Sequence, residues 1–153
     1  MHRKTLETTM TDREKAYKHL IDCEIHPSMQ RIAIMQYLMT HHTHPTVDDV
    51  YKDLCPQLPT LSRTTVYNTL RMFSEKKAAL MITIDDHRVC YDGNTEPHVH
   101  FYCKKCNKVY DMMDEEAPLN ITKYIHGNLV EDTQLYYRGI CSHCLEAEKQ
   151  KAS

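Results

Sequence analysis

Residues 62–73 read SRTTVYNTLRMF and residues 80–91 read LMITIDDHRVCY. Within the first run, Val66, Leu70 and Phe73 recur at helical spacing, which predicts a helix with one buried stripe. Within the second run, residues 80–84 and 88–91 are apolar and β-branched on either side of a polar turn, which predicts a hairpin. Three helices followed by a two-stranded wing make a winged helix-turn-helix, a small module that reads DNA.

Three more helices are predicted upstream of residue 62. Thr11, Ser28 and Thr46 stand as N-cap residues in front of apolar positions with helical spacing, and Ser62 caps the fourth helix. The polar face of that last helix carries side chains that can contact base edges and phosphates: Arg63, Thr64, Tyr67, Asn68 and Arg71. An isolated face of this kind is also typical of a solvated helix, so its place in front of the wing is what favours DNA.

The segment Gly93-Asn94-Thr95-Glu96-Pro97 is a turn that we expect to mark a domain boundary. Residues 1–92 would form the winged-helix DNA-binding domain and residues 93–153 a second domain. In the second domain the pattern predicts strands at 98–101 and 108–111, a polar helix over about 114–126 ended by Gly127, a strand over 129–138 and a short C-terminal helix from 146. The expected fold class is therefore α+β.

Composition excludes several classes of protein. A net charge of −2 gives no overall basic field, and three glycines argue against a glycine-rich phosphate loop. No apolar run approaches the roughly 20 residues that cross a bilayer. Because the chain starts with Met1-His2-Arg3-Lys4 and not with an apolar signal segment, we expect a reducing cytoplasm.

Two Cys-x-x-Cys pairs, Cys103/Cys106 and Cys141/Cys144, supply four thiols for a tetrahedral structural zinc site. Residues 107–140 separate the pairs, which is more than the roughly 15–20 residues of a common zinc ribbon, so the metal would join distant segments. Two disulfides are the alternative, which an oxidising compartment would favour. The remaining cysteines are expected to be core thiols: Cys23, Cys55 and Cys90.

A second constellation contains histidines and aspartates. His98 and His100 are two residues apart on a predicted strand, so both imidazoles leave the same face. The alternative is a pair of exposed histidines without a ligand, but carboxylates and a third imidazole occur nearby: Asp92, Asp111 and His44. Such a nitrogen and oxygen site is harder than a thiolate cage and suits iron or manganese as well as zinc, in a reversible manner.

Together, these motifs resemble those of the ferric uptake regulator (Fur) family. Residues 98–106 match its H-x-H-x-x-C-x-x-C signature, residues 141–144 resemble its second cysteine pair, and residues 44–51 and 62–70 resemble its helix motifs. The resemblance extends over about residues 15–145. It implies a bacterial, homodimeric, metal-responsive repressor of operator DNA, with an N-terminal winged helix and a C-terminal α/β dimerisation domain, and not an enzyme.

Within this family, the chain is most similar to the peroxide-sensing, PerR-like branch. Asp92 and Asp111 stand where the iron-sensing branch generally has glutamates, and the zinc-sensing branch often has cysteine in place of Asp92. The resemblance implies a structural Zn²⁺ and, in addition, a regulatory Fe²⁺ or Mn²⁺ held by His44, Asp92, His98, His100 and Asp111. It also implies that iron-catalysed oxidation of His44 or His98 by peroxide releases the DNA.

Three other functions remain open from the sequence. The chain could be a sensor of iron or zinc level in the same family, or a zinc-stabilised interaction module without a DNA role. It could also be a metal hydrolase that uses His98, His100 and an open coordination position. The absence of an H-E-x-x-H segment and of a serine or cysteine nucleophile motif argues against the hydrolase.

Overall fold

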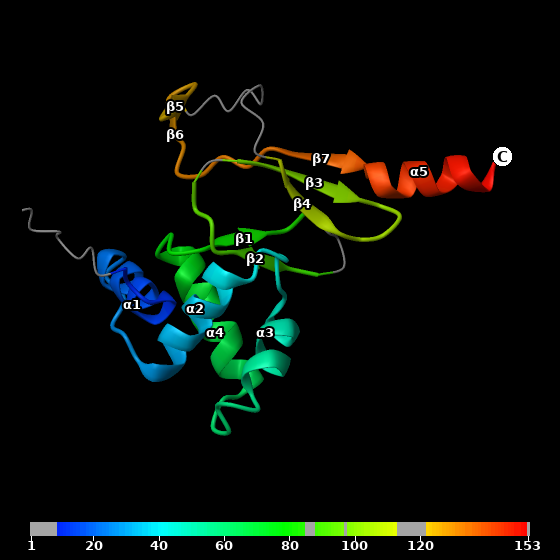
Figure 1. The fold of residues 1–153 in the computed structure, drawn as a ribbon. Helices are drawn as coiled ribbons and strands as arrows, with labels where there is room; N and C mark the ends of the chain where they lie inside the picture. Colours follow the sequence, from blue (N-terminus) through cyan, green and yellow to red (C-terminus); the bar gives the residue numbers. More distant parts are fainter. Residues whose placement is uncertain (1–8, 85–87, 97, 113–121, 153) are drawn as a thin grey trace, which may run out of the picture. The chain divides into compact units, whose positions relative to one another are not determined.

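The structure is a computed structural model that describes residues 9–84, 88–96, 98–112 and 122–152. It consists of two compact units. Unit 1 comprises Met1–Ile82 and Val89–Thr95, and unit 2 comprises Thr83–Arg88 and Glu96–Ser153. Helices and strands occur in both units, so the predicted α+β class is confirmed (Figure 1). No helix in the described ranges combines the length and apolar character that a membrane crossing requires.

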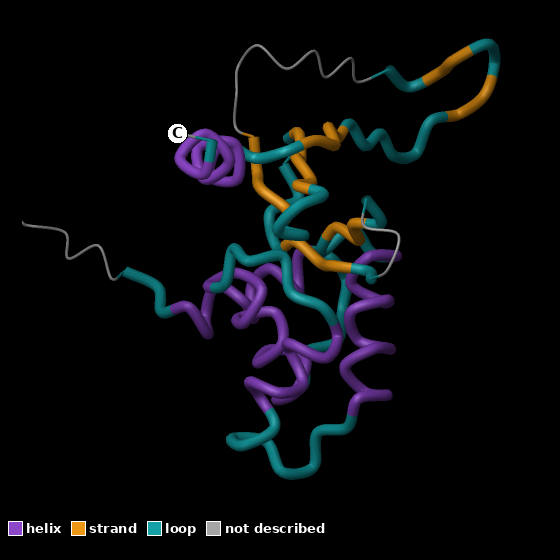
Figure 2. Tube along the Cα trace, turned by 90° about the vertical axis from the view of Figure 1, so that its right-hand side faces the viewer, coloured by secondary structure: helices purple, strands orange, loops and turns teal. Residues whose placement is uncertain are grey.

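Unit 1 contains four helices followed by a β-hairpin, in the order predicted. Figure 2 shows these helices as purple coils. The elements are α1 (Asp12–Asp22), α2 (Met29–Thr40), α3 (Val47–Leu54), α4 (Arg63–Glu75), β1 (Leu80–Ile82) and β2 (Cys90–Asp92).

All four helices of unit 1 begin after the predicted N-cap residues. In each case the cap side chain accepts a hydrogen bond from the backbone N–H three residues later. In α1 and α3 the bond is reciprocated, because the carboxylates of Glu14 and Asp49 accept from the backbone N–H of Thr11 and Thr46. Each such cap contributes about 1 kcal/mol, so the starts of these helices are determined locally by the sequence.

The core of unit 1 forms around α4. Its predicted stripe of Val66, Leu70 and Phe73 is completely buried. The other helices contribute side chains to the same cluster, including Leu20, Ile34, Met35, Leu38 and Val50. This packing leaves the opposite face of α4 exposed, which is the face with the candidate DNA-binding residues.

The wing is an antiparallel pair in which Leu80 lies opposite Asp92 and Ile82 lies opposite Cys90. The paired strands are shorter than predicted, and the predicted turn at residues 85–87 lies outside the described residues. Directly after β2, Gly93 lies against the backbone of α2. A Cβ on Gly93 would be 2.8 Å from the Leu38 carbonyl oxygen, so only glycine fits this approach of strand to helix.

Unit 2 is built on a three-stranded sheet with the order β4-β3-β7. The central strand β3 (Val99–Cys103) pairs antiparallel with β4 (Val109–Met112) and parallel with β7 (Tyr136–Gly139). Helix α5 (Ser142–Lys151) follows β7 directly and continues in its direction (Figure 1). A small hairpin of β5 (Tyr124–Ile125) and β6 (Asn128–Leu129) projects away from the sheet (Figure 2).

Two predictions for unit 2 are wrong where the structure describes them. The polar helix expected over about 114–126 is absent after residue 121, since 124–125 form β5; residues 114–121 lie outside the described part. His126 and Gly127 have φ angles of 48° and 81° and form the two-residue turn of a hairpin, so Gly127 ends no helix. The strand expected over 129–138 is interrupted, because the polar run 131–134 has no alternation and β7 starts only at Tyr136.

Replacing Gly93 by alanine is expected to destabilise unit 1. The new methyl group would meet backbone atoms of Leu38, which cannot move without shifting α2. We expect Gly93→Ala to lose about 1–3 kcal/mol of unfolding free energy in thermal or urea denaturation. The matched control is Gly139→Ala, whose Cβ would meet the Phe101 ring at 3.3 Å, a contact that a small ring rotation relieves. Equal stability of Gly93→Ala and the parent protein would contradict the close approach.

Candidate metal centres

The four cysteines of the two pairs converge in unit 2. Cys103 ends β3, Cys106 lies in the turn towards β4, Cys141 is the N-cap residue of α5, and Cys144 lies in the first turn of α5. The parallel pairing of β3 and β7 places Cys103 opposite Gly139, which brings the second pair to the first. We refer to Cys103, Cys106, Cys141 and Cys144 as the sulfur cluster.

The geometry of the sulfur cluster fits a tetrahedral metal, and no disulfide joins its cysteines in the structure. The Sγ atoms of Cys103 and Cys144 are 3.9 Å apart, as are those of Cys106 and Cys141, and all four lie within 4.8 Å of one another. A disulfide requires about 2.05 Å, and all cysteines of the chain are free thiols. A zinc ion with four Zn–S bonds of about 2.3 Å places its sulfurs about 3.8 Å apart, close to the observed spacing.

Backbone N–H groups stabilise negative charge on two of the sulfurs. Burial opposes ionisation of Cys103, but the backbone N–H groups around it outweigh burial and lower the pKa of its thiol to about 6. The backbone N–H of Cys144 lowers the pKa of Cys141. Hydrogen bonding with Cys141 instead raises the pKa of Cys144 to about 12, so the cluster without a cation shares protons among its sulfurs. A bound cation replaces those protons.

A phenol lies beside the sulfurs, and no spacing pattern in the sequence predicts this contact. The hydroxyl of Tyr110 in β4 is 3.6 Å from Cys141 Sγ and 3.8 Å from Cys106 Sγ. These two contacts, with Cys141 first, raise the pKa of Tyr110 and keep its hydroxyl protonated. The tyrosine therefore faces the cluster as a hydrogen-bond donor.

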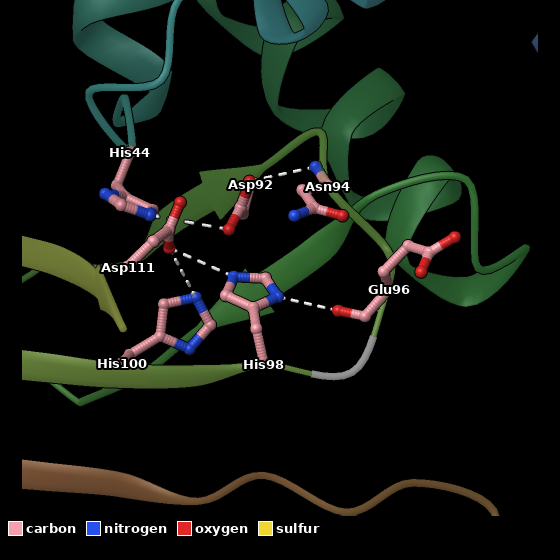
Figure 3. A network of polar contacts seen from close by, with 7 residues as sticks. All are labelled: His44, Asp92, Asn94, Glu96, His98, His100 and Asp111. Carbon is pink, nitrogen blue, oxygen red and sulfur yellow. Dashed lines mark hydrogen bonds and ion pairs between the residues drawn. The ribbon is translucent and has the colours of Figure 1, made fainter. Parts of the chain in front are cut away.

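The histidine pair of unit 2 converges on one carboxylate. His98 Nε2 is 3.0 Å and His100 Nε2 is 3.3 Å from the same Oδ1 of Asp111, which lies opposite His100 in the β3–β4 ladder (Figure 3). Both histidines are buried, with 8 % and 6 % of their surface exposed, so they are not the exposed pair that was the alternative. We refer to His98, His100 and Asp111 as the β3–β4 cluster.

The orientation of His98 fits a cation in this cluster. Its Nδ1 is 2.6 Å from the backbone carbonyl oxygen of Glu96, which can only accept, so Nδ1 carries the hydrogen (Figure 3). In the neutral ring, Nε2 then presents a lone pair to the Asp111 carboxylate. Two acceptors at 3.0 Å repel unless a proton or a metal ion lies between them. A backbone carbonyl that fixes the far nitrogen of a histidine is the usual support of a metal-ligating imidazole.

A second imidazole–carboxylate pair lies within unit 1. His44 Nε2 is 3.4 Å from Asp92 Oδ2, and both side chains are buried (Figure 3). His44 has φ of 54°, which is uncommon for a residue before proline, and the Pro45 carbonyl oxygen accepts from the backbone N–H of Tyr91 at 2.9 Å. The backbone N–H of Asn94 donates to Asp92 Oδ1 at 2.9 Å. We refer to His44 and Asp92 as the loop–wing pair.

The three cysteines outside the sulfur cluster differ in how deeply they are buried. Cys90 is buried on β2, as expected of a core thiol, whereas Cys23 and Cys55 are only partly buried.

The polar face of α4 is exposed at every predicted DNA-binding position: Arg63, Thr64, Tyr67, Asn68 and Arg71. Both cations of this face have acidic partners. Arg63 forms an ion pair with Asp48 of α3 and lies 4.7 Å above the ring of Tyr51, and Arg71 Nε is 3.2 Å from Glu75. No sequence pattern predicts the contacts of Arg63, because they depend on how α3 packs against α4.

The chain is similar in sequence and in fold to known proteins. The profile of the "Ferric uptake regulator family" matches residues 22–138. The peroxide-responsive repressor PerR of Staphylococcus epidermidis is 32% identical over 145 residues, covering 92% of this chain and 95% of that protein. The peroxide stress regulator of Campylobacter jejuni has a TM-score of 0.63 at 27% identity, covering 88% of this chain and 100% of the other. The ferric uptake regulator of Pseudomonas aeruginosa with manganese has a TM-score of 0.67 at 21% identity, over 83% and 98% of the two chains, and supports the fold alone.

The sulfur cluster is expected to hold one zinc per chain and to stabilise unit 2. Zinc sites of this type contribute about 10–16 kcal/mol of apparent binding energy to folding. The loss of one ligand therefore weakens zinc binding and destabilises the fold. We expect Cys144→Ser to reduce the zinc content measured by atomic emission and to lower the unfolding temperature. Cys55→Ser is the control, since Cys55 is partly buried in unit 1 and lies outside the cluster. Full zinc content in Cys144→Ser would argue against the four-sulfur site.

Proposed function

Because the chain belongs to the ferric uptake regulator family, we propose that it is a metal-dependent repressor that binds operator DNA as a homodimer and releases it on exposure to peroxide. Membership makes it a transcriptional regulator, and we propose no enzymatic activity for it. A repressor of this kind acts in the cytoplasm, where the free thiols of the sulfur cluster also persist.

The observation that carries the proposal is that each unit contains a set of nitrogen and oxygen ligands that is too small to complete a metal site by itself. The loop–wing pair offers a nitrogen and an oxygen, and the β3–β4 cluster offers two nitrogens and an oxygen. Neither set alone fills the coordination shell of iron or manganese. We propose that one regulatory Fe²⁺ or Mn²⁺ is held by both sets together, while the sulfur cluster keeps a structural Zn²⁺.

An ion shared by two units favours one relative orientation of them. Binding then shifts the population towards that orientation, and in a dimer this fixes the separation of the two α4 helices. Half-sites on DNA are spaced by about one helical turn, 34–36 Å, so only a matching separation binds tightly. By linkage, operator DNA increases the affinity for the metal to the same degree.

Peroxide sensing rests on the similarity to peroxide-responsive regulators and on the two aspartates, Asp92 and Asp111. When bound, Fe²⁺ supplies the electrons that reduce peroxide, a reaction that Mn²⁺ supports far less. His44 and His98 are the imidazoles that we propose to be oxidised, one in each unit. An imidazole that has gained an oxygen is a poor ligand, so the two units are no longer held in the DNA-binding orientation.

The experiment compares Fe²⁺-loaded and Mn²⁺-loaded protein before and after peroxide. The operator is first selected from a pool of random duplexes with the Mn²⁺-loaded protein. We expect peroxide to abolish the gel shift of the iron form and to add about one oxygen to a peptide containing His44 or His98, with the manganese form unchanged.

Two other outcomes of the same experiment are decisive. A gel shift that depends on metal but survives peroxide, with no oxygen on either histidine, would identify a sensor of metal level in the same family. Oxygen confined to the sulfur cluster would reject histidine oxidation as the trigger.

The contribution of α4 to DNA binding is tested at Arg71. This exposed side chain pairs with Glu75 in the protein and can exchange that partner for phosphate or a base edge. We expect Arg71→Ala to weaken binding of the Mn²⁺-loaded protein to the selected duplex by about 1–3 kcal/mol and to reduce the salt dependence, measured by titration at several salt concentrations. Lys149→Ala removes the same charge from the far end of α5 and is expected to change neither quantity. Equal effects of both substitutions would exclude a specific role of α4.

A further inference from the structure

Strand β4 connects the two metal centres of unit 2 through neighbouring residues. Asp111 belongs to the β3–β4 cluster, and the preceding residue, Tyr110, contacts the sulfur cluster. Successive side chains of a strand leave opposite faces, which explains how adjacent residues serve different centres. The function of Asp111 is covered by the proposed regulatory site, whereas Tyr110 has no role in it.

The hydroxyl of Tyr110 contacts two of the four sulfurs, at 3.6 Å from Cys141 and 3.8 Å from Cys106. When the cluster holds zinc, all four sulfurs are thiolates and can only accept hydrogen bonds. The single hydrogen of the phenol then points to Cys141 Sγ and is shared with Cys106 Sγ. A charge-assisted hydrogen bond withdraws electron density from the acceptor and makes the thiolate a weaker nucleophile.

Small solutes can reach this phenol. A surface pocket of about 330 Å³ is lined by Tyr110 and Cys141, together with Phe101, Ile140 and His143. A water molecule occupies about 30 Å³, so the pocket is large enough for a peroxide molecule. Burial alone therefore does not shield Cys141 from an oxidant.

We propose that Tyr110 is a positioning residue that protects the sulfur cluster from peroxide, through hydrogen bonds to Cys141 and Cys106, so that the structural metal is retained during peroxide exposure. This inference rests on the proposed function in one respect: a peroxide sensor must meet its oxidant without losing the site that stabilises its own fold. The protected chemistry itself involves only the sulfurs and peroxide.

The reaction that Tyr110 slows is a two-electron oxidation. A thiolate forms an S–O bond with one oxygen of hydrogen peroxide, the O–O bond breaks, and hydroxide leaves with the electron pair. A neighbouring thiolate then forms an S–S bond with the oxidised sulfur, and the second hydroxide leaves. Two thiolates together lose two electrons and one peroxide gains them. The cluster then retains only two of its four ligands for the metal.

The test uses full-length, zinc-loaded protein from which iron and manganese have been removed. Tyr110→Phe deletes the hydroxyl and keeps the ring, and Tyr137→Phe is the matched control, because Tyr137 is an exposed tyrosine of the same sheet. Zinc release during peroxide treatment is followed with a chromogenic chelator. A charge-assisted hydrogen bond changes an equilibrium by about ten-fold or more, and a Brønsted coefficient of about 0.4–0.5 transmits part of this to the rate. We therefore expect about three- to ten-fold faster release from Tyr110→Phe.

A control with the chelator and no peroxide shows whether Tyr110 protects the sulfurs from peroxide or only slows the loss of zinc. We expect Tyr110→Phe and the parent protein to lose zinc equally slowly without peroxide. If release accelerates to the same degree with and without peroxide, Tyr110 only holds the metal and the proposal is overturned. Identical rates in peroxide for Tyr110→Phe and the parent protein would overturn it as well.

A second measurement does not depend on the stability of the variant. Within the described part of the chain, the hydrogen-bond contacts of Cys144 are with the other three sulfurs, and Tyr110 contacts only Cys141 and Cys106. Brief peroxide treatment of the parent protein with a 1,3-dione trap should therefore label Cys144 before Cys141 or Cys106. First labelling at Cys141 or Cys106 would contradict protection by the phenol. Because no iron is present, these results stand apart from the outcome of the histidine-oxidation experiment.

Discussion

The register of β3 against its two neighbours is the constraint on which both metal centres of unit 2 depend. Its N-terminal end presents His100 opposite Asp111, and its C-terminal end places Cys103 opposite Gly139, next to the start of α5. Because side chains alternate along a strand, a slip by one residue would turn His100 away from Asp111 and carry Cys103 away from the second cysteine pair. One hydrogen-bonding pattern therefore positions two different sets of ligands.

The two sets differ in the kind of cation that they favour. Four sulfurs, two of them stabilised as thiolates by backbone N–H groups, suit a soft or borderline ion that stays bound. Imidazoles and carboxylates suit harder ions that exchange more readily. In the proposed function, the permanent ion is bound by sulfur and the exchangeable ion by nitrogen and oxygen, so the fold would persist while the regulatory site fills and empties.

The sequence predicted best what local chemistry determines. The four N-caps, the helix order of unit 1 and the convergence of the cysteine pairs follow from Thr11, Ser28, Thr46, Ser62 and the Cys-x-x-Cys spacing. The shared face of His98 and His100 followed from strand alternation. The hairpin β5–β6 was not predicted, because a glycine such as Gly127 is found both at the C-terminal ends of helices and in hairpin turns. The Asp48–Arg63 pair, the Glu96 carbonyl behind His98 and the Tyr110 phenol depend on packing between segments, which no spacing rule encodes.

Helix α5 has an unusual support. None of its described residues is buried, and the side chain of its N-cap residue, Cys141, belongs to the sulfur cluster. Ten residues are too few for an isolated helix to persist in water, and the surface ion pair of Lys105 with Glu148 adds little. The sulfur cluster is therefore the cap and the anchor of this helix. If oxidation of the four cysteines released a bound metal, α5 would lose this support, so we expect the state of the sulfurs to control the order of the C-terminal end.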